Sequence, residues 1–336
     1  MNERYSRQEL FRPIGENGQN KLRIKHVLIL GCGALGTTNA EMLVRAGIGR
    51  VTIIDRDYVE FSNLQRQQLF SEQDAIEQIP KAIAAKNRLN NINSDVEIDA
   101  YVMDATSSKI LPLLKSVDLV IDATDNFDVR LMMNDLLQKQ NITWIFGSCV
   151  GSMGMSFTIR PGDTPCLNCL LDRAPLTGAT CDSVGIISPA VQMVAAHQTT
   201  EALKYLVEDF DAMRSSLVTF DLWNNNYQTI NVNRAKKETC TTCGTNPSFP
   251  YLQYENQTKT EVLCGRETVQ IRTGREVNIE DLALRLTKLG KVNLNPFLVS
   301  LEYQSYRLVF FKDGRTLIHG TNSIEKAKRL YYQIIG

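Results

Sequence analysis

Residues 26–36 read HVLILGCGALG, and this stretch decides the fold. The mostly apolar run His26–Leu30 has the length of a buried strand and leads directly into Gly31, Gly33 and Gly36. Glycines at this spacing between a strand and a helix permit a tight turn and let a phosphate approach the backbone at the helix N-terminus. The stretch predicts the first half of a nucleotide-binding α/β domain, although a strand–helix turn without a ligand is the structural alternative.

The following segments continue this pattern. A second apolar run, Val51–Ile54, ends on Asp55, nineteen residues after Gly36. A carboxylate at that place accepts hydrogen bonds from ribose hydroxyls in dinucleotide-binding folds. Further strands are expected at Val96–Tyr101, Asp118–Asp122 and Thr143–Gly147. With helices between the strands, the predicted fold class is α/β with a Rossmann-like, largely parallel sheet.

The composition excludes several classes of protein. The 336 residues carry 37 basic and 37 acidic side chains, so no broad basic field is available for nucleic acid or an anionic membrane. No apolar run approaches the roughly 18–20 residues of a membrane span. The charged N-terminus, MNERYSRQEL, lacks the apolar core of a secretory signal. We expect a cytoplasmic protein with reduced cysteines that binds neither nucleic acid nor membrane.

Polar residues that suit a triphosphate follow the glycine loop. The run Ser62–Gln67 reads SNLQRQ, and Lys81 stands in the first turn of a predicted helix. The cations of Arg66 and Lys81 suit a charge-dense polyphosphate, although such charges also occur on solvated faces. Asp125 and Asn126 follow the end of a predicted parallel strand, where ligands bind in open sheets. Asp125 is placed to hold magnesium, and the alternative is that the pair caps the next helix.

Four of the eight cysteines form two Cys-x-x-Cys pairs, Cys166 with Cys169 and Cys240 with Cys243. Two such pairs in a reducing compartment are typical of a closed, tetrahedral, four-thiolate zinc site, and the alternative is a redox motif. Cys181 stands alone in a segment rich in glycine and threonine, where it is a candidate nucleophile or an inert thiol.

Motifs in a fixed order resemble the ThiF/MoeB/HesA family, the bacterial relatives of ubiquitin-activating enzymes. The matching segments are RYSRQ at 4–8, GCGALG at 31–36, DRDYVEFSNLQRQ at 55–67, PKA at 80–82, DATDN at 122–126, PCLNC at 165–169, TCDSVGIISP at 180–189 and CTTCG at 240–244. The resemblance implies ATP-dependent adenylation of the C-terminal glycine of a ubiquitin-like sulfur-carrier protein ending in Gly-Gly. It also implies later thiocarboxylate formation for thiamine or molybdopterin synthesis, with a cysteine desulfurase or another sulfur donor as a partner.

The resemblance also assigns residues to ATP, magnesium and catalysis. The implied nucleotide-binding residues are Gly31, Gly33, Ala34, Gly36, Asp55, Asp57, Ser62, Asn63, Leu64, Gln65, Arg66, Lys81, Asp125 and Asn126. The implied catalytic residues are Arg7, Arg66, Lys81, Asp125 and Cys181. Arg7 would reach into the ATP site of the neighbouring subunit, so the active unit would be a homodimer. Cys181 matches a loop cysteine that some branches use to bind the carrier's acyl group.

The last part of the chain lies outside these motifs. We expect an adenylation domain at 1–245, a linker at 246–260 and a small α+β domain of unknown role at 261–336. In that domain, the pattern predicts single strands at Glu261–Arg272 and Val292–Leu301. Cys264 there is a candidate strand-end residue, and the alternative is a thiol whose pKa is lowered by the neighbouring Arg266.

Three alternatives stay open at the level of sequence. An NAD-dependent oxidoreductase would account for the glycine loop and Asp55, but not for the SNLQRQ run or Lys81. An enzyme that adenylates another peptide or protein carboxylate would use the same residues. A zinc-bearing binding module without catalysis would account for the cysteines alone.

Overall fold

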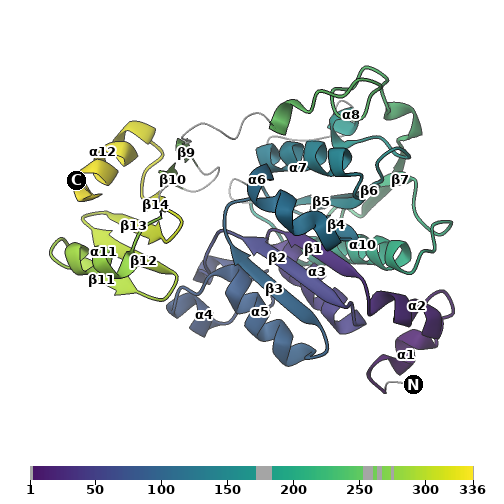
Figure 1. Cartoon of the computed structure of the whole chain (residues 1–336), viewed down its shortest axis with the longest axis horizontal. Helices are drawn as coiled ribbons and strands as arrows, with labels where there is room; N and C mark the ends of the chain where they lie inside the picture. Colours follow the sequence, from purple (N-terminus) through teal and green to yellow (C-terminus); the bar gives the residue numbers. More distant parts are fainter. Residues whose placement is uncertain (1–2, 172–183, 253–259, 263–266, 274–275, 336) are drawn as a thin grey trace. The chain divides into compact units, whose positions relative to one another are not determined.

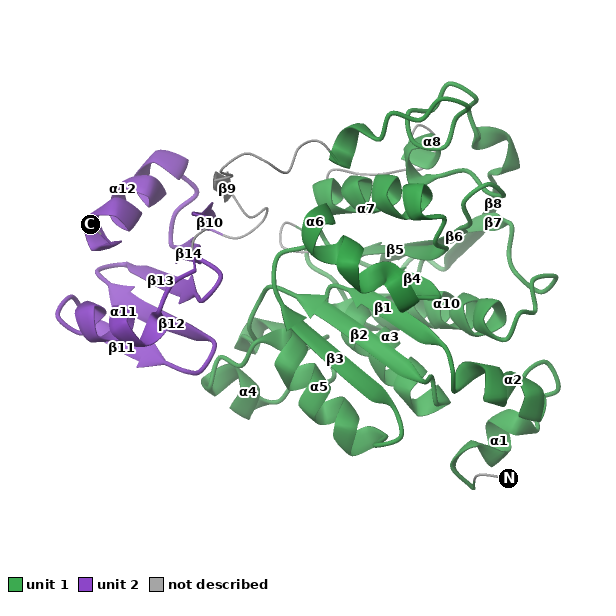
Figure 2. Ribbon diagram, viewed as in Figure 1, with its two compact units in different colours: residues 1–179, 184–255 green, residues 180–183, 256–336 purple. Residues whose placement is uncertain are grey.

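The computed structural model describes residues 3–171, 184–252, 260–262, 267–273 and 276–335. Contacts divide the chain into two compact units, residues 1–179 with 184–255, and residues 180–183 with 256–336 (Figure 2). The division at 255 and 256 falls inside the segment expected to be a linker, whose exact limits stay a prediction.

The larger unit is built on an eight-stranded sheet with the order β3-β2-β1-β4-β5-β6-β7-β8 (Figure 1). Its strands are β1 (His26–Leu30), β2 (Arg50–Asp55), β3 (Glu97–Val102), β4 (Leu119–Asp122), β5 (Trp144–Val150), β6 (Met153–Ile159), β7 (Ser216–Asp221) and β8 (Asn226–Asn231). β1 to β5 pair in parallel, and β6, β7 and β8 extend the sheet in antiparallel fashion. The predicted Rossmann-like α/β fold is confirmed.

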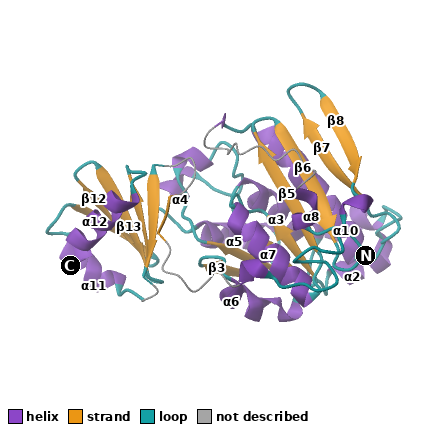
Figure 3. Ribbon diagram, turned by 90° about the horizontal axis from the view of Figure 1, so that it is seen from above, coloured by secondary structure: helices purple, strands orange, loops and turns teal. Residues whose placement is uncertain are grey.

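Helices cover both faces of this sheet (Figure 3). They are α1 (Ser6–Glu9), α2 (Gly15–Leu22), α3 (Ala34–Ala46), α4 (Glu72–Ile76), α5 (Lys81–Ile92), α6 (Ser107–Ile110), α7 (Phe127–Gln140), α8 (Leu167–Leu171) and α10 (Ser188–Leu206). Alternation along β1 explains the two layers, because successive strand side chains point to opposite faces. Val27 and Ile29 pack in the core with α3 and α5, whereas Leu28 and Leu30 pack in the core with α7.

The smaller unit is a six-stranded antiparallel sheet with the order β11-β12-β13-β14-β10-β9 and two helices. Its elements are β9 (Thr260–Val262), β10 (Thr268–Arg272), α11 (Ile279–Leu286), β11 (Lys291–Leu294), β12 (Leu298–Tyr303), β13 (Tyr306–Phe311), β14 (Arg315–His319) and α12 (Ile324–Ile335). Side chains of both helices and of the central strands share one apolar core. The expected α+β class of this part of the chain is therefore confirmed.

Two predicted strands of the smaller unit were wrong. Val292–Leu301 is a hairpin of β11 and β12, because the Asn295 carboxamide accepts hydrogen bonds from the N–H groups of Phe297 and Leu298, at 2.9 and 3.0 Å, and turns the chain. Glu261–Arg272 contains two antiparallel strands, β9 and β10. Cys264 lies between them, outside the described residues.

No helix among the described residues is long and apolar enough to cross a membrane.

Candidate nucleotide site and metal centre

The parallel strands β1, β2, β4 and β5 end at one edge of the sheet, here called the carboxyl edge. Gly31 follows β1 with a φ of 93°, in the left-handed region that favours glycine. The next N–H, that of Cys32, donates to Asp55 Oδ2 at 2.5 Å, and the N–H of Asp57 donates to Asp55 Oδ1 at 2.7 Å. Asp55 is thereby fixed beside the glycine loop, with carboxylate lone pairs left to accept further hydrogen bonds.

Buried charge surrounds this carboxylate. Burial raises the pKa of Asp55 above its ordinary value, and the Lys81 ammonium opposes the shift. The Lys81 side chain begins α5, is only 4% exposed, and places Nζ 3.5 Å from Asp57 Oδ2. Lys81 is therefore a buried cation of the carboxyl edge and not part of a solvated face.

Arg56 is a functional candidate that the sequence analysis missed. Its guanidinium donates to Asp104 Oδ1 at 3.2 Å, and its side chain is 19% exposed. Burial lowers the pKa of Arg56, but three carboxylates outweigh burial and raise it above the ordinary value: those of Asp57, Asp104 and Asp125. Arg56 therefore links the end of β2 electrostatically to the loop after β4. Its place between Asp55 and Asp57 in the sequence was the available signal.

The loop after β4 is held by a buried ion pair. Arg130 Nε lies 2.9 Å from Asp122 Oδ2, and both side chains are buried. Asp122 Oδ1 accepts from Thr124 N at 3.0 Å and Oγ1 at 2.7 Å, while Arg130 Nη2 donates to the carbonyl oxygen of Thr124. Asn126 caps α7 by accepting from Asp128 N at 2.8 Å and Val129 N at 3.1 Å, so its carboxamide oxygen has a structural use. Asp125, between these fixed residues, is exposed.

The SNLQRQ run forms a short helical turn and the chain after it. Asn63 is buried and its Oδ1 accepts from Glu60 N at 3.0 Å, which closes the turn 61–63. Arg66 is half-buried, and its Nη1 donates to the carbonyl oxygen of Ser62 at 2.8 Å. Ser62 and Gln65 are exposed and Leu64 is half-buried. The phosphate contacts expected of this run therefore stay a prediction. The hydrogen bond to Ser62 uses one N–H group of the Arg66 guanidinium and leaves the others for a ligand.

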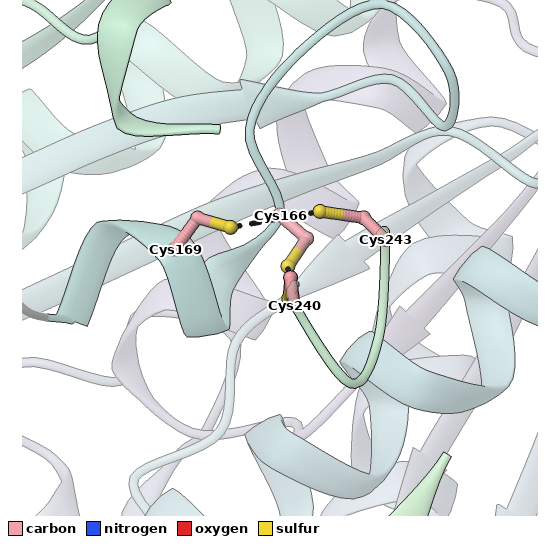
Figure 4. Close-up of side chains that lie close together, drawn as sticks. All are labelled: Cys166, Cys169, Cys240 and Cys243. Carbon is pink, nitrogen blue, oxygen red and sulfur yellow. Dashed lines mark hydrogen bonds between the residues drawn. The ribbon is translucent and has the colours of Figure 1, made fainter. Parts of the chain in front are cut away.

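The four cysteines of the two Cys-x-x-Cys pairs come together as predicted (Figure 4). Their Sγ atoms all lie within 4.8 Å of one another, with 3.6 Å between Cys166 and Cys240 and between Cys169 and Cys243. A zinc ion with Zn–S bonds of about 2.3 Å requires S···S distances of about 3.8 Å, so the donor set fits tetrahedral zinc. The hydrogen bond from Cys166 lowers the pKa of Cys243 to about 5, which favours a thiolate there.

Hydrogen bonds tie this metal centre to α7. The Asn134 carboxamide accepts from the N–H of Leu167, at 2.8 Å, next to the first cysteine. The Thr242 hydroxyl donates to Asp135 Oδ1 at 2.6 Å, and Tyr251 N donates to Asp135 Oδ2 at 2.8 Å. Because these partners orient both cysteine loops, they act as the supporting shell that a structural metal site needs.

Comparison with known proteins agrees with this geometry. A model of the ThiF family matches residues 5–242. The chain belongs to the ThiF family. The sulfur carrier protein ThiS adenylyltransferase of Bacillus subtilis strain 168 is 52% identical over 339 residues, which cover 100% of both chains. The sulfur carrier protein adenylyltransferase of Thermus thermophilus is 33% identical over 73% of this chain and 92% of its own.

Solved structures support the fold of this ThiF-family chain. Escherichia coli MccB, crystallised with MccA-N7isoASN, has a TM-score of 0.64 at 23% identity, over 73% of this chain and 76% of its own. The same protein with ATP gives a TM-score of 0.62 at 22% identity, over 73% of this chain and 75% of its own. At these identities the likeness shows the fold alone.

One predicted site residue of the described part, Arg7, is not brought to the carboxyl edge of its own chain, and a second cannot be placed. Cys181 lies outside the described residues. Arg7 is exposed on α1, which packs near the C-terminal end of α3, since Gln8 Nε2 donates to the carbonyl oxygen of Ala46 at 2.9 Å. The glycine loop is at the other end of α3, thirteen residues or about 20 Å away. Arg7 therefore cannot reach its own nucleotide loop.

Alanine should have different effects at two glycines of the loop, on stability at one and on ATP binding at the other. A Cβ on Gly36 would lie 2.0 Å from the carbonyl oxygen of Gly31, whereas the nearest atom to a Cβ on Gly33 is Gln67 Nε2 at 3.9 Å. Gly36→Ala should lower the free energy of unfolding by at least about 2 kcal/mol in urea titrations. Gly33→Ala should change it by less than about 0.5 kcal/mol, but weaken ATP binding in calorimetry because the methyl group fills the open side of the loop. Unchanged ATP affinity in Gly33→Ala would contradict this use of the open side.

The metal centre predicts about one zinc ion per chain and a structural effect of losing it. Cys169→Ser should abolish stoichiometric zinc in metal analysis and lower thermal stability, because three thiolates leave the tetrahedral set incomplete. Cys149→Ser is the control. Cys149 packs against an apolar cluster and is not one of the four metal-centre cysteines, so this variant should bind as much zinc as the wild-type protein. A zinc-free Cys169→Ser protein with wild-type stability would show that the four thiols are not a structural metal site.

Proposed function

We propose that this protein activates the C-terminal glycine of a ubiquitin-like sulfur-carrier protein ending in Gly-Gly, by transfer of AMP from ATP. The full-length similarity to a ThiS adenylyltransferase carries the proposal. The site supports it, because Asp55, the glycine loop and the buried Lys81 ammonium meet at one edge of the sheet. An NAD-dependent oxidoreductase has no evident need for such an ammonium beside the loop.

In the proposed reaction, the carrier's carboxylate oxygen attacks the α-phosphorus of ATP and pyrophosphate leaves, which gives an acyl-adenylate. Asp55 accepts the ribose hydroxyls, and Lys81 and Arg66 offset the charge of the phosphates. Asn63 and the helix N-terminus at Ala34 add donors around them. Magnesium, held from Asp125, would supply further positive charge to the leaving pyrophosphate. Asp125 suits that role because its carboxylate is exposed while the residues on either side of it are fixed.

Exposed apolar side chains at the same edge support a folded protein as the substrate. Met153 begins β6, Trp223 lies in the β7–β8 turn, and Tyr227 lies in β8, at 44, 77 and 52% exposure. Strand pairing puts all three at the carboxyl edge. β4 and β8 are separated by four strand spacings, or about 19 Å. About six residues of extended chain span that distance. A carrier docked on this patch would therefore reach Asp125 with its C-terminal tail.

We further infer that the active unit is a homodimer. Arg7 is exposed and lies at the opposite end of α3 from its own nucleotide loop. A guanidinium there is useful to catalysis only if a second subunit brings its ATP site to it. Leu10 and Phe11, at 65 and 59% exposure, give the same segment an apolar surface for such packing.

The later steps follow from the same proposal. A thiol that takes the acyl group would displace AMP and form a thioester. The persulfide of a cysteine desulfurase or another donor would then displace that thiol and form an acyl disulfide. Reduction of the acyl disulfide by a further thiol would give the thiocarboxylate for thiamine or molybdopterin synthesis. Cys181 is proposed as the thiol that receives the acyl group. The cytoplasmic location also stays a prediction.

The adenylation proposal predicts ATP–pyrophosphate exchange that requires a carrier ending in Gly-Gly. Asp125→Asn, which keeps the shape of the side chain, should lower exchange by at least about 100-fold, in line with losing one well-placed charge in a transition state. Asp55→Ala should mainly raise the KM for ATP. Asp128→Asn, a change of an exposed carboxylate three residues further on, should leave exchange unchanged. Full exchange in Asp125→Asn would remove this residue from the mechanism.

The homodimer proposal predicts complementation between two inactive variants. Arg7→Ala and Asp125→Ala, mixed under subunit exchange, should form heterodimers in which one site lacks both residues and the other is intact. Up to about half of wild-type activity per heterodimer should return, because Arg7 belongs to the partner's site and each variant alone loses about 10²–10³-fold. Native mass spectrometry would count the heterodimers. Confirmed heterodimers without recovered exchange would show that Arg7 does not serve the neighbouring site.

A further inference from the structure

A cluster of polar and aromatic side chains beside α10 belongs neither to the nucleotide edge nor to the metal centre. His197 of α10 lies against β7 and β8, with its ring centroid 6.2 Å from that of Phe220 and 6.0 Å from that of Tyr227. His197 and Arg214, which stands just before β7, are half-buried, whereas Tyr227 is 52% exposed. β8 is the last strand of the sheet (Figure 3). The cluster therefore links α10 to an exposed edge strand.

The two ring nitrogens of His197 have different partners. Arg214 Nη1 lies 3.3 Å from Nδ1, and the Tyr227 hydroxyl oxygen lies 3.4 Å from Nε2. A guanidinium can only donate hydrogen bonds, so Nδ1 accepts and the proton of the neutral imidazole lies on Nε2. Nε2–H then donates to the Tyr227 oxygen. The tyrosine O–H proton remains available, because this hydroxyl has no second hydrogen-bond partner in the part of the chain that the structure describes.

Arg214 is itself held in place by several contacts. Its Nε donates to the carbonyl oxygen of Ser216 at 3.1 Å, and its Nη2 donates to the carbonyl oxygen of Ser156 at 3.4 Å. Its backbone N–H donates at 3.0 Å to the carboxylate of Glu201, a residue that is only 1% exposed. The guanidinium therefore approaches His197 from a fixed direction.

The surroundings keep the imidazole neutral. Burial lowers the pKa of His197, and the Arg214 guanidinium and the Lys204 ammonium lower it further, whereas the Glu201 carboxylate opposes them. Protonation would also place a proton on Nδ1, against the guanidinium. His197 therefore stays neutral at neutral pH and keeps Nε2–H as the donor to Tyr227.

Tyr227 stands where the proposed carrier would dock. It is the second residue of β8. The first residue of β8 pairs with Asp221, which also pairs with Met153 at the start of β6, so the tyrosine lies at the carboxyl edge. A folded protein presents main-chain carbonyl oxygens there as acceptors. A tyrosine suits such a partner, since it combines the contact area of a ring with one polar group.

We propose that His197 and Arg214 are positioning residues of the carrier-binding surface, which hold the Tyr227 O–H ready to donate to a main-chain carbonyl oxygen of the docked sulfur carrier. The proposal rests on the proposed adenylation function and deepens it. Both residues act through Tyr227 and contact neither ATP nor the reacting carboxylate.

The tautomer is the first measurement, because it does not depend on the carrier. The chain has three histidines, so nitrogen NMR signals of the imidazole rings can be assigned with a His197→Gln variant. Nε2 of His197 should carry the proton in the wild-type protein. Arg214→Met should give a mixture of both tautomers, because Nδ1 loses its donor. A proton on Nδ1 in the wild-type protein would overturn the proposal.

The second measurement is calorimetry with the whole chain and the sulfur carrier protein ThiS of Bacillus subtilis as the probe. Tyr227→Phe should weaken carrier binding about 3- to 10-fold, the range for one neutral hydrogen bond, and should raise the KM for the carrier but not for ATP. His197→Leu should weaken binding by a similar factor alone, but by less than about 2-fold in the Tyr227→Phe background, because both changes remove the same contact. His197→Gln keeps one donor and one acceptor and should lose less than His197→Leu.

Tyr332→Phe is the control, because Tyr332 is also an exposed tyrosine, on α12 of the smaller unit, and this variant should keep wild-type carrier affinity. Unchanged carrier affinity in Tyr227→Phe, or additive losses in the double variant, would overturn the proposal. A changed monomer–dimer balance in Tyr227→Phe without loss of carrier affinity would also overturn it, since the hydroxyl would then serve a second copy of the chain. A wild-type protein without carrier-dependent ATP–pyrophosphate exchange would instead overturn the proposed function and leave the NMR result in place.

Discussion

Parallel pairing of β1 with its two neighbours is the constraint on which the site depends. Leu30, the last residue of β1, pairs with Ile54 on one side and Asp122 on the other. The next residue, Gly31, donates its N–H to the carbonyl oxygen of Ile54 at 2.8 Å. A Cβ on Gly31 would lie 2.5 Å from the carbonyl oxygen of Ala123, so the segments that follow β1, β2 and β4 leave the sheet in close contact. Polar residues that begin where each apolar strand ends are therefore delivered to one place by strand pairing alone.

The polar interior beneath this edge gives the loop after β4 one conformation. The Asp122–Arg130 pair is buried, and burial raises the pKa of Asp122 while Arg130 opposes the shift. A second buried residue, Gln198 of α10, donates to the carbonyl oxygens of Asp122 at 2.8 Å and Ile145 at 3.1 Å, which joins β4 to β5. Buried ion pairs add little net stability compared with apolar packing. We infer that this set is present because it orients the backbone around Thr124, and with it Asp125.

Local sequence patterns predicted the elements of the larger unit but not the contacts among them. The glycine spacing and the acid at position 55 made the fold predictable, because few residue types fit the backbone geometry that the nucleotide-binding turn requires. The two cysteine pairs were predictable because tetrahedral thiolate coordination restricts their spacing. Arg56 was missed because an arginine between two aspartates looks like a surface residue. Its contacts depend on burial, which comes from packing of distant segments. The β11–β12 turn was missed because one asparagine carboxamide interrupts an otherwise continuous apolar pattern.

Helix α7 explains how a closed metal centre can matter to chemistry that it does not perform. The helix begins at its Asn126 cap, directly after Asp125, and its Asn134 and Asp135 side chains hold both cysteine loops. The nine residues from the cap to Asp135 correspond to about 13 Å of helix. Arg130, between these two points, carries the ion pair that holds Thr124. The helix is thus fixed by polar contacts at its N-terminus and past its middle, and loosening of the cysteine loops would free the helix that positions Asp125. Four thiolates would leave a bound zinc ion no open coordination position, so we infer that its influence on the nucleotide edge would be mechanical and would pass through α7.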